Sequence, residues 1–154
     1  MTTPAENPAR PLVFILNGPN LDLLGDRQPE IYGRETLEEL QANCERRAEE
    51  LGLRIEFRQT NSEGTLVDHI HDARAAARAI IINPAAYAHT SIAVLDALLA
   101  CEMPIMEVHI SNPATREDFR HIDYTARAAT GVINGCGTNG YLLALQQVAT
   151  LLKG

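Results

Sequence analysis

The sequence predicts an α/β fold in which a five-stranded parallel sheet carries helices on both faces. Short apolar runs alternate along the chain with longer stretches of helical periodicity. A continuous apolar run indicates a strand that is buried on both faces, as in parallel sheets. Repeated strand–helix units then build a parallel sheet, because each right-handed crossover places its helix on one face.

Each expected element rests on its own pattern. The expected strands are residues 12–16, 53–58, 79–82, 105–110 and 129–133, and the expected helices are residues 37–51, 65–77, 90–101, a short one from 115, and 139–152. Thr36 and Glu39 form a capping box before the first helix, and Gly52 ends it. In residues 53–58 apolar and charged residues alternate, which is typical of a half-buried edge strand.

The length and composition describe one globular domain. The chain has 154 residues, 45% of them hydrophobic and 21% charged. No apolar run approaches the ~20 residues of a membrane span. The first eleven residues are polar and lack the apolar segment of a secretory signal. We expect residues 1–11 to form a disordered N-terminal tail and residues 12–154 to form a single domain.

Residue counts exclude several classes of function. With 13 Lys and Arg against 20 Asp and Glu, the net charge is −7, unlike that of a nucleic-acid binder. Lys153 is the only lysine, so neither a Schiff base nor a P-loop is supported. The three cysteines form no C-x-x-C pair and indicate neither a disulfide framework nor a zinc site. This cysteine usage favours a reducing, cytoplasmic setting.

A candidate site lies at the carboxyl ends of the strands. Ligands of open parallel sheets bind at this edge. Asn17 and Asn83 each directly follow an expected strand, and His109 lies near the end of another. Residues 18–35 form a long polar stretch after the first strand, and loops of that length are usually functional. We therefore expect this stretch to hang over the site.

Two pairs of residues indicate acid–base chemistry. Glu107 and His109 are two apart in a strand, so they face the same side, where the carboxylate would orient the ring. A buried histidine satisfied by its neighbours is the alternative. Arg27 and Tyr32 lie in the long stretch. A phenol is a poor base at neutral pH unless a nearby cation stabilises the phenolate.

Further arginines indicate an anionic ligand. Arg116 and Arg120 are four apart on the expected short helix and would present to one face. A surface helix with salt bridges is the alternative. Arginines near a site in an acidic protein favour a small anion.

Short motifs in this order resemble type II 3-dehydroquinate dehydratase over about residues 12–152. They are residues 16–21 (LNGPNL), 24–33 (LGDRQPEIYG), 61–64 (NSEG), 83–91 (NPAAYAHTS), 107–112 (EVHISN), 116–120 (REDFR) and 140–145 (GYLLAL). The resemblance implies a flavodoxin-like three-layer sandwich with one catalytic domain. It also implies conversion of 3-dehydroquinate to 3-dehydroshikimate in the shikimate pathway of aromatic amino acid and chorismate biosynthesis. The elimination of water would be anti and would pass through an enolate, without cofactor or metal.

The resemblance also implies residue roles. Tyr32 would be the proton acceptor, His109 the proton donor, and Arg27 the stabiliser of the phenolate and the transition state. Asn17 would hold a water at the enolate, and Glu107 would orient His109. The implied substrate-binding residues are Asn83, His89, Asp96, Ile110, Ser111, Arg116 and Arg120. Asp96 would come from a neighbouring subunit of a dodecamer built from trimers, with no nucleic-acid or membrane partner.

The chain departs from the family pattern in two places. Asp123 precedes Tyr124 where members commonly have Ser-Tyr, and residues 134–137 (NGCG) are unusual. The resemblance gives neither segment a catalytic role, so we expect the departures to affect subunit packing rather than chemistry.

Other functions remain open. Residues 135–140 fit G-x-G-x-x-G, but the dinucleotide fingerprint needs a following strand with an acidic residue about 20 positions on, so a tight turn is favoured. A flavodoxin-like module could hold FMN or accept a phosphoryl group, although a receiver domain would have an acidic cluster where Asn17 stands. The same dehydration could also serve catabolism of quinate.

Overall fold

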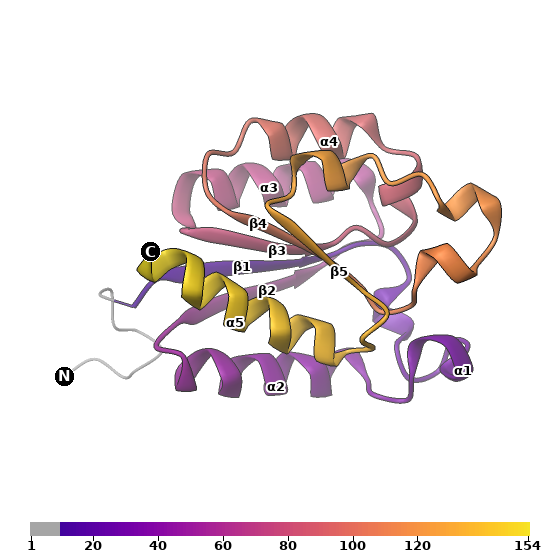
Figure 1. Ribbon diagram of the computed structural model, residues 1–154, viewed down its shortest axis with the longest axis horizontal. Helices are drawn as coiled ribbons and strands as arrows, with labels where there is room; N and C mark the ends of the chain where they lie inside the picture. The colour runs from indigo at the N-terminus through magenta and orange to yellow at the C-terminus, as the bar shows by residue number, and fades with distance from the viewer. Residues whose placement is uncertain (1–9) are drawn as a thin grey trace.

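A five-stranded, all-parallel sheet forms the centre of the molecule, as predicted (Figure 1). The structure is a computed structural model that describes residues 10–154. The strand order is β2-β1-β3-β4-β5. The strands are β1 (Leu12–Asn17), β2 (Arg54–Gln59), β3 (Ala79–Asn83), β4 (Ile105–His109) and β5 (Gly131–Asn134). β2 lies at an edge, which confirms the prediction from its alternating pattern.

Helices cover both faces of the sheet. α2 (Leu37–Glu50) and α5 (Asn139–Lys153) pack on one face, while α3 (Glu63–Ala76) and α4 (Ile92–Leu99) pack on the other (Figure 1). Short helical turns occupy the connections: η2 (Leu21–Leu23), α1 (Pro29–Tyr32), η3 (Ala85–His89), η4 (Pro113–Thr115), η5 (Asp118–Arg120) and η6 (Thr125–Ala128). Among residues 10–154, no helix combines the length and apolar character needed to cross a membrane.

Alternating side chains divide the core into two halves. In β1, Val13 and Ile15 pack towards α2 and α5, whereas Phe14 and Leu16 pack towards α3 and α4. The alternation follows from the pleat, which directs successive side chains to opposite faces. In β4 the same rule turns Glu107 and His109 to the α3/α4 side, since Met106 and Val108 pack on the other.

Several boundaries differ from those expected. Residues 1–9 of the expected tail lie outside the described residues. The last two residues of that tail pair with the start of β2. The Arg10 carbonyl accepts from Arg54 Nε at 3.1 Å, and the Pro11 carbonyl accepts from the Arg54 N–H at 3.0 Å. The expected loop over residues 18–35 contains η2 and α1. α3 begins before the expected residue 65 because the Ser62 hydroxyl caps it, accepting from the Thr65 N–H at 3.2 Å.

The helix expected from residue 115 is wrong. Two turns, η4 and η5, stand in its place. Asn112 caps the first turn by accepting from the Ala114 N–H at 3.2 Å. Arg116 then takes an extended conformation (φ −110°, ψ −167°), which ends the turn.

A buried hydrogen-bond chain joins α5 to the ends of β1 and β3. The Tyr141 hydroxyl donates to Asn17 Oδ1 at 2.7 Å and accepts from Asn83 Nδ2 at 2.9 Å. Asn17 Nδ2 donates to the Arg58 carbonyl at 3.0 Å, and Asn83 Oδ1 accepts from the Ala85 N–H at 3.0 Å. Tyr141 and Asn17 are fully buried, and burial raises the pKa of the Tyr141 phenol, so it stays a donor.

We expect Tyr141→Phe to lower the free energy of unfolding by about 1–3 kcal/mol, because buried Asn17 and Asn83 each lose a partner. Urea unfolding followed by circular dichroism measures the change. Tyr124→Phe is the matched control, since the Tyr124 hydroxyl makes no hydrogen bond within residues 10–154, and its effect should stay within about 0.5 kcal/mol. Equal stability of the two variants would contradict this account of the network.

Candidate active site

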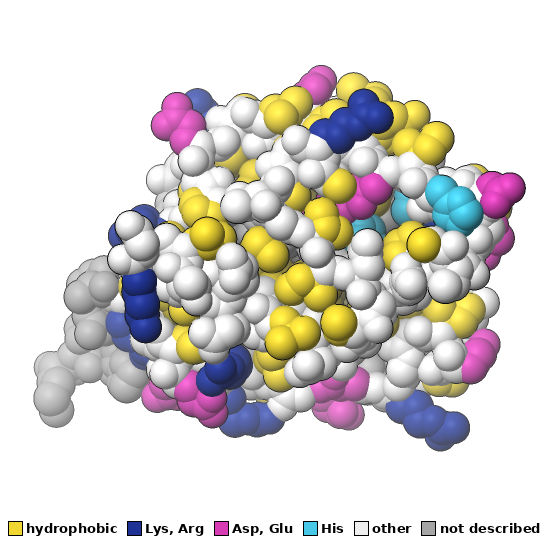
Figure 2. Space-filling view, in the orientation of Figure 1, with side chains coloured by type: hydrophobic (Ala, Val, Ile, Leu, Met, Phe, Trp, Pro, Cys, Tyr) yellow, Lys and Arg dark blue, Asp and Glu magenta, His cyan; other side chains and the backbone are white. Residues whose placement is uncertain are grey.

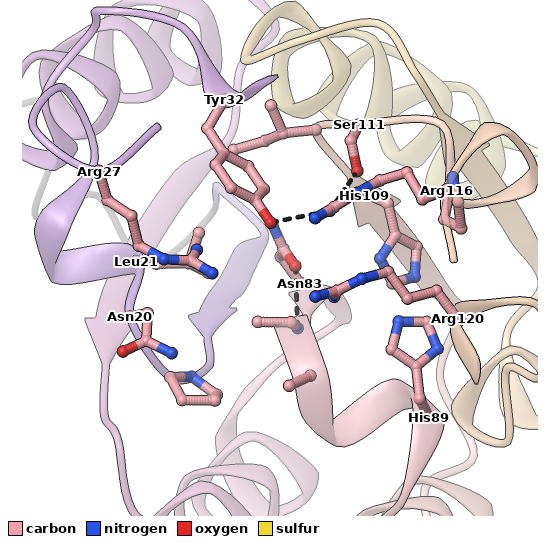
Figure 3. A pocket seen from close by; sticks show the side chains of 15 residues that line it. Asn20, Leu21, Arg27, Tyr32, Asn83, His89, His109, Ser111, Arg116 and Arg120 are labelled. Carbon is pink, nitrogen blue, oxygen red and sulfur yellow. Dashed lines mark hydrogen bonds between the residues drawn. The ribbon is translucent and has the colours of Figure 1, made fainter. Parts of the chain in front are cut away.

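A pocket of about 90 Å³ opens at the carboxyl edge of the sheet. It lies where the chain leaves β1 and β3, and there the Gly18 N–H donates to the Asn83 carbonyl at 2.8 Å. Tyr32, the last residue of α1, points into it (Figure 3). The predicted residues that line it are Arg27, Tyr32, Asn83, His89, His109, Ile110, Ser111, Arg116 and Arg120. Strand ends meet at this edge because the sheet is parallel.

Three guanidinium groups converge on the pocket. Arg27 reaches in from the segment before α1, and Arg116 and Arg120 from the opposite wall (Figure 3). No Asp or Glu is among the residues that line it. The chain as a whole carries a net charge of −7. The pocket is therefore a local positive region that favours a small anion.

Tyr32 is held by two arginines in different ways. Arg116 Nη1 donates to the Tyr32 hydroxyl oxygen at 2.8 Å and to Ser111 Oγ at 3.3 Å. The Arg27 guanidinium carbon lies 4.8 Å from the Tyr32 ring centroid, a cation–π contact with the ring face. The guanidinium that touches the phenol oxygen is thus that of Arg116, whereas the sequence predicted Arg27.

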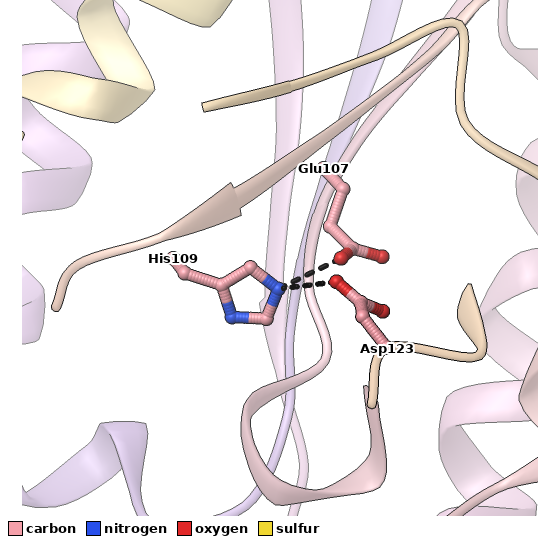
Figure 4. Close-up of side chains that lie close together, drawn as sticks. All are labelled: Glu107, His109 and Asp123. Carbon is pink, nitrogen blue, oxygen red and sulfur yellow. Dashed lines mark hydrogen bonds and ion pairs between the residues drawn. The ribbon is translucent and has the colours of Figure 1, made fainter. Parts of the chain in front are cut away.

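Two carboxylates approach the same ring nitrogen of His109 (Figure 4). Its Nε2 is 2.7 Å from Glu107 Oε2 and 3.2 Å from Asp123 Oδ2. Burial lowers the pKa of His109, but the hydrogen bonds to Asp123 and Glu107 outweigh burial and raise it to about 9. Nδ1 makes no hydrogen bond within residues 10–154. An Nε2–H therefore points at the carboxylates, and His109 itself lines the pocket.

Glu107 and Asp123 differ in their surroundings. Burial raises the pKa of Glu107 to about 7. Burial also acts to raise the pKa of Asp123, but hydrogen bonds to His109, Glu107 and the Ala126 N–H hold it well below its usual value. The Thr125 hydroxyl contacts both carboxylates.

The Glu107–His109–Asp123 cluster is built for shared protons rather than for a metal ion. The ligand atoms lie within 4.8 Å of one another. Two ligands each about 2.1 Å from a common ion stay ~3 Å or more apart, whereas Glu107 Oε2 and His109 Nε2 are 2.7 Å apart. We assign no metal-binding role to the cluster.

Three predicted residues lie away from the pocket lining: Glu107, which sits behind His109, Asn17 and Asp96. Both ends of the Asn17 amide are engaged by Tyr141 and the Arg58 carbonyl, and Asn17 is fully buried. Asp96 is exposed on α4. The placement of Asp96 in the site of a neighbouring subunit stays a prediction.

Sequence reasoning missed three residues at the site. Asp123 was noted only as a departure that affects packing; its contact with His109 corrects that expectation. Asn20 (φ 70°) and Ala85 (φ 53°) line the pocket in left-handed backbone conformations. Hydrogen bonds from the Asn20 N–H to Asn61 and from the Ala85 N–H to Asn83 accompany them, at 3.0 Å each. An alanine with positive φ has no sequence signature.

We expect Arg116→Ala to speed amide exchange across residues 27–33 by about tenfold, because a hydrogen bond to a charged group contributes ~1.5 kcal/mol. The reporting amides are those of Tyr32 and Gly33, which donate to Gln28 and Pro29 carbonyls. Hydrogen exchange with mass spectrometry measures the rate. Arg120→Ala is the control, because its guanidinium pairs with Glu117 at 2.8 Å rather than with Tyr32. Equal rates in both variants would contradict docking of α1 by Arg116.

Comparisons with known proteins agree with this geometry. The family model described as "Dehydroquinase class II" matches residues 11–149. The 3-dehydroquinate dehydratase of Methylobacterium radiotolerans is 54% identical over 92% of this chain and 95% of its own, and that of Streptomyces avermitilis is 56% identical over 92% and 89%. The crystal structure of a type II dehydroquinase from Propionibacterium acnes superposes with a TM-score of 0.87 at 46% identity, over 90% of this chain and 96% of that one. The chain belongs to the class II dehydroquinase family.

Proposed function

We propose that the chain removes water from 3-dehydroquinate to give 3-dehydroshikimate. The observation that carries the proposal is a pocket lined by three arginines and no carboxylate, with Tyr32 and His109 on different walls. The names of its relatives, 3-dehydroquinate dehydratase, supply the substrate. Such a substrate is an anionic β-hydroxy ketone, which suits a positive pocket with one base and one acid.

The reaction needs a proton removed from C2 and a hydroxyl lost from C1. We assign removal to Tyr32, because it lines the pocket with its oxygen 2.8 Å from Arg116 Nη1 and its ring against the Arg27 guanidinium. The electron pair of the C2–H bond moves into the C3 carbonyl and forms an enolate. The enolate collapses as His109 gives a proton to the leaving hydroxyl, so water departs. A base and an acid on opposite faces make the elimination anti.

The proton donor is then Nδ1 of His109. Its Nε2–H is committed to Glu107 and Asp123, and the ring lines the pocket. The cluster keeps the ring protonated at neutral pH, since the hydrogen bonds raise the pKa of His109 to about 9. A general acid that is charged before the reaction can protonate a poor leaving group.

Substrate binding falls to the remaining polar groups. The carbonyl oxygens of His109, Ile110 and Ser111 accept from the N–H groups of the loop after β5, which fixes the backbone after β4. We propose that the N–H groups of Ile110 and Ser111 take the substrate carboxylate, as an oxyanion-binding concavity does. Asn83, His89 and Arg120 would bind the hydroxyls. A water held by Asn17 at the enolate would require Asn17, which is fully buried behind the lining, to become accessible when the substrate binds.

The reaction belongs to the shikimate pathway and yields a conjugated enone. Its ultraviolet absorbance on addition of 3-dehydroquinate is the direct test of function. A protein that gives no enone from this substrate under conditions where it is folded would refute the proposal. An absorption spectrum with bound flavin would favour an FMN module instead.

We expect Tyr32→Phe to lower kcat by about 10²–10⁴-fold with the fold intact, the range that general base catalysis supplies. Arg116→Gln and Arg27→Gln should also lower kcat, because each removes a cation that contacts Tyr32. Tyr124→Phe is the control and should keep the parent kcat. Substantial turnover by Tyr32→Phe would show that Tyr32 is not the base.

We also propose that the site is completed across a contact between copies of the chain, in a dodecamer of trimers. On α4, Ile92 and Leu99 are 50% and 58% exposed on either side of exposed Asp96. Apolar side chains also gather over α5 and β5 (Figure 2), where Val132 and Leu143 are 40% and 43% exposed. Exposed apolar surface of this kind supports an interface with a second copy.

Mixing two inactive variants tests this placement of Asp96. If Asp96 acts in a neighbour's site, co-refolding Asp96→Ala with Tyr32→Phe should restore activity, because some sites then combine an intact Tyr32 with an intact Asp96 from different chains. Co-refolding Tyr32→Phe with His109→Ala should restore none where both residues come from one chain only. Sedimentation velocity checks that the mixtures assemble. A fully active monomer would refute the proposal.

A further inference from the structure

Asp123 reaches the same nitrogen of His109 as Glu107 does, from a different part of the chain. Glu107 shares β4 with His109, whereas Asp123 lies between η5 and η6. The two carboxylate oxygens stand 2.7 and 3.2 Å from His109 Nε2 (Figure 4). The single Nε2–H of His109 is therefore shared by two carboxyl groups, which can differ in the negative charge that they carry.

Solvation and hydrogen bonding favour the charge on Asp123. The Glu107 side chain is 0% exposed and the Asp123 side chain is 24% exposed. Asp123 Oδ1 also accepts from the Ala126 backbone N–H at 3.0 Å, and Glu107 has no backbone donor within residues 10–154. The Thr125 hydroxyl has one proton, which it can give to one carboxylate at a time. Ionising the fully buried carboxyl therefore costs more than ionising Asp123.

We propose that Asp123 is a positioning residue for His109: it is the permanent counter-ion of the imidazolium and holds Nε2 away from the pocket. Glu107 is then the partner that retains a proton for part of the time near neutral pH. The pKa values of the two carboxyl groups agree with this division. Burial raises the pKa of Glu107 to about 7, whereas hydrogen bonds lower the pKa of Asp123 despite its burial. The role that the family resemblance gives to Glu107 alone is divided in this chain between two carboxylates.

The other charged groups around His109 oppose protonation. Arg116 and Arg120 line the same pocket, and the His89 ring stacks at 6.2 Å between centroids. Because Tyr32, once ionised, is the only anion on the pocket side among the described lining residues, the carboxylates behind the ring must supply the counter-charge. If Asp123 loses its charge, His109 should therefore give up its proton at a lower pH than in the parent protein.

Histidine titration by NMR tests this without reference to activity. In ring-labelled protein, Asp123→Asn should lower the titration midpoint of His109 by about one pH unit or more, as expected for loss of a neighbouring opposite charge. Asp123→Ser, which places the common family residue at this position, should do the same. Glu107→Gln should lower the midpoint less than Asp123→Asn. Asp118→Asn, an exposed carboxylate on η5, is the control for net charge and should leave the midpoint unchanged.

Activity gives a second readout, which rests on the proposed function. The alkaline limb of kcat should move to lower pH in Asp123→Asn by the same amount as the NMR midpoint, with kcat near the parent value on the acid side. A role in packing alone would lower kcat at every pH. The proposal is overturned if the His109 midpoint is the same in folded Asp123→Asn and parent, or if Glu107→Gln shifts it more. If the parent gives no enone, the proposed function fails while the NMR result still decides the role of Asp123.

Discussion

The close approach of the chain segments that leave β1 and β3 is the constraint on which the site depends. The Gly18 N–H binds the Asn83 carbonyl, and a Cβ on Gly18 would lie 2.4 Å from the Pro84 carbonyl oxygen. Any side chain there would push the two segments apart. Because they touch, the loop that carries Arg27 and Tyr32 starts beside η3, and both reach the end of β4. The buried chain through Tyr141 fixes the same two strand ends from below.

Charge is arranged in layers around His109. Behind the ring, two carboxylates share its Nε2–H inside the protein. In front of it, three arginines face the pocket, which no acidic side chain lines. The separation matters because an acidic protein repels an anion from most of its surface, while the low dielectric inside strengthens the few positive contacts. The same separation keeps the imidazolium charged without placing a carboxylate where it would repel the ligand.

Tyr32 owes its position to residues far away in the sequence. It lies in a four-residue helix with no fully buried member, and Tyr32 itself is only partly buried where it packs against the core. Arg116, 84 positions later, holds the hydroxyl from the opposite wall. A segment held mainly by contacts with the opposite wall of a pocket can detach with modest loss of stability, as ligand-binding segments generally do. In the proposed reaction, the base and the docking of α1 use one guanidinium group.

The sequence by itself determined the parallel sheet, the edge position of β2, the α2 cap at Thr36 and the pairing of Glu107 with His109. These follow from apolar periodicity, capping chemistry and the two-residue repeat of a strand, which are local properties. The resemblance of short motifs to one family added His89, Ile110 and Ser111 to the pocket residues that strand ends and charged pairs had already indicated. Only the tertiary structure decided which of these groups touch. It placed Arg116 on the Tyr32 hydroxyl and Arg27 on its ring, put Asp123 beside His109, and removed the helix expected at Arg116. The contacts of Arg116 with Tyr32 and of Asp123 with His109 join segments separated by 84 and 14 positions, with no periodic pattern between them. A carboxylate in a loop looks solvated in the sequence, and only the packing of η6 against β4 and α4 turns Asp123 inwards to meet the histidine.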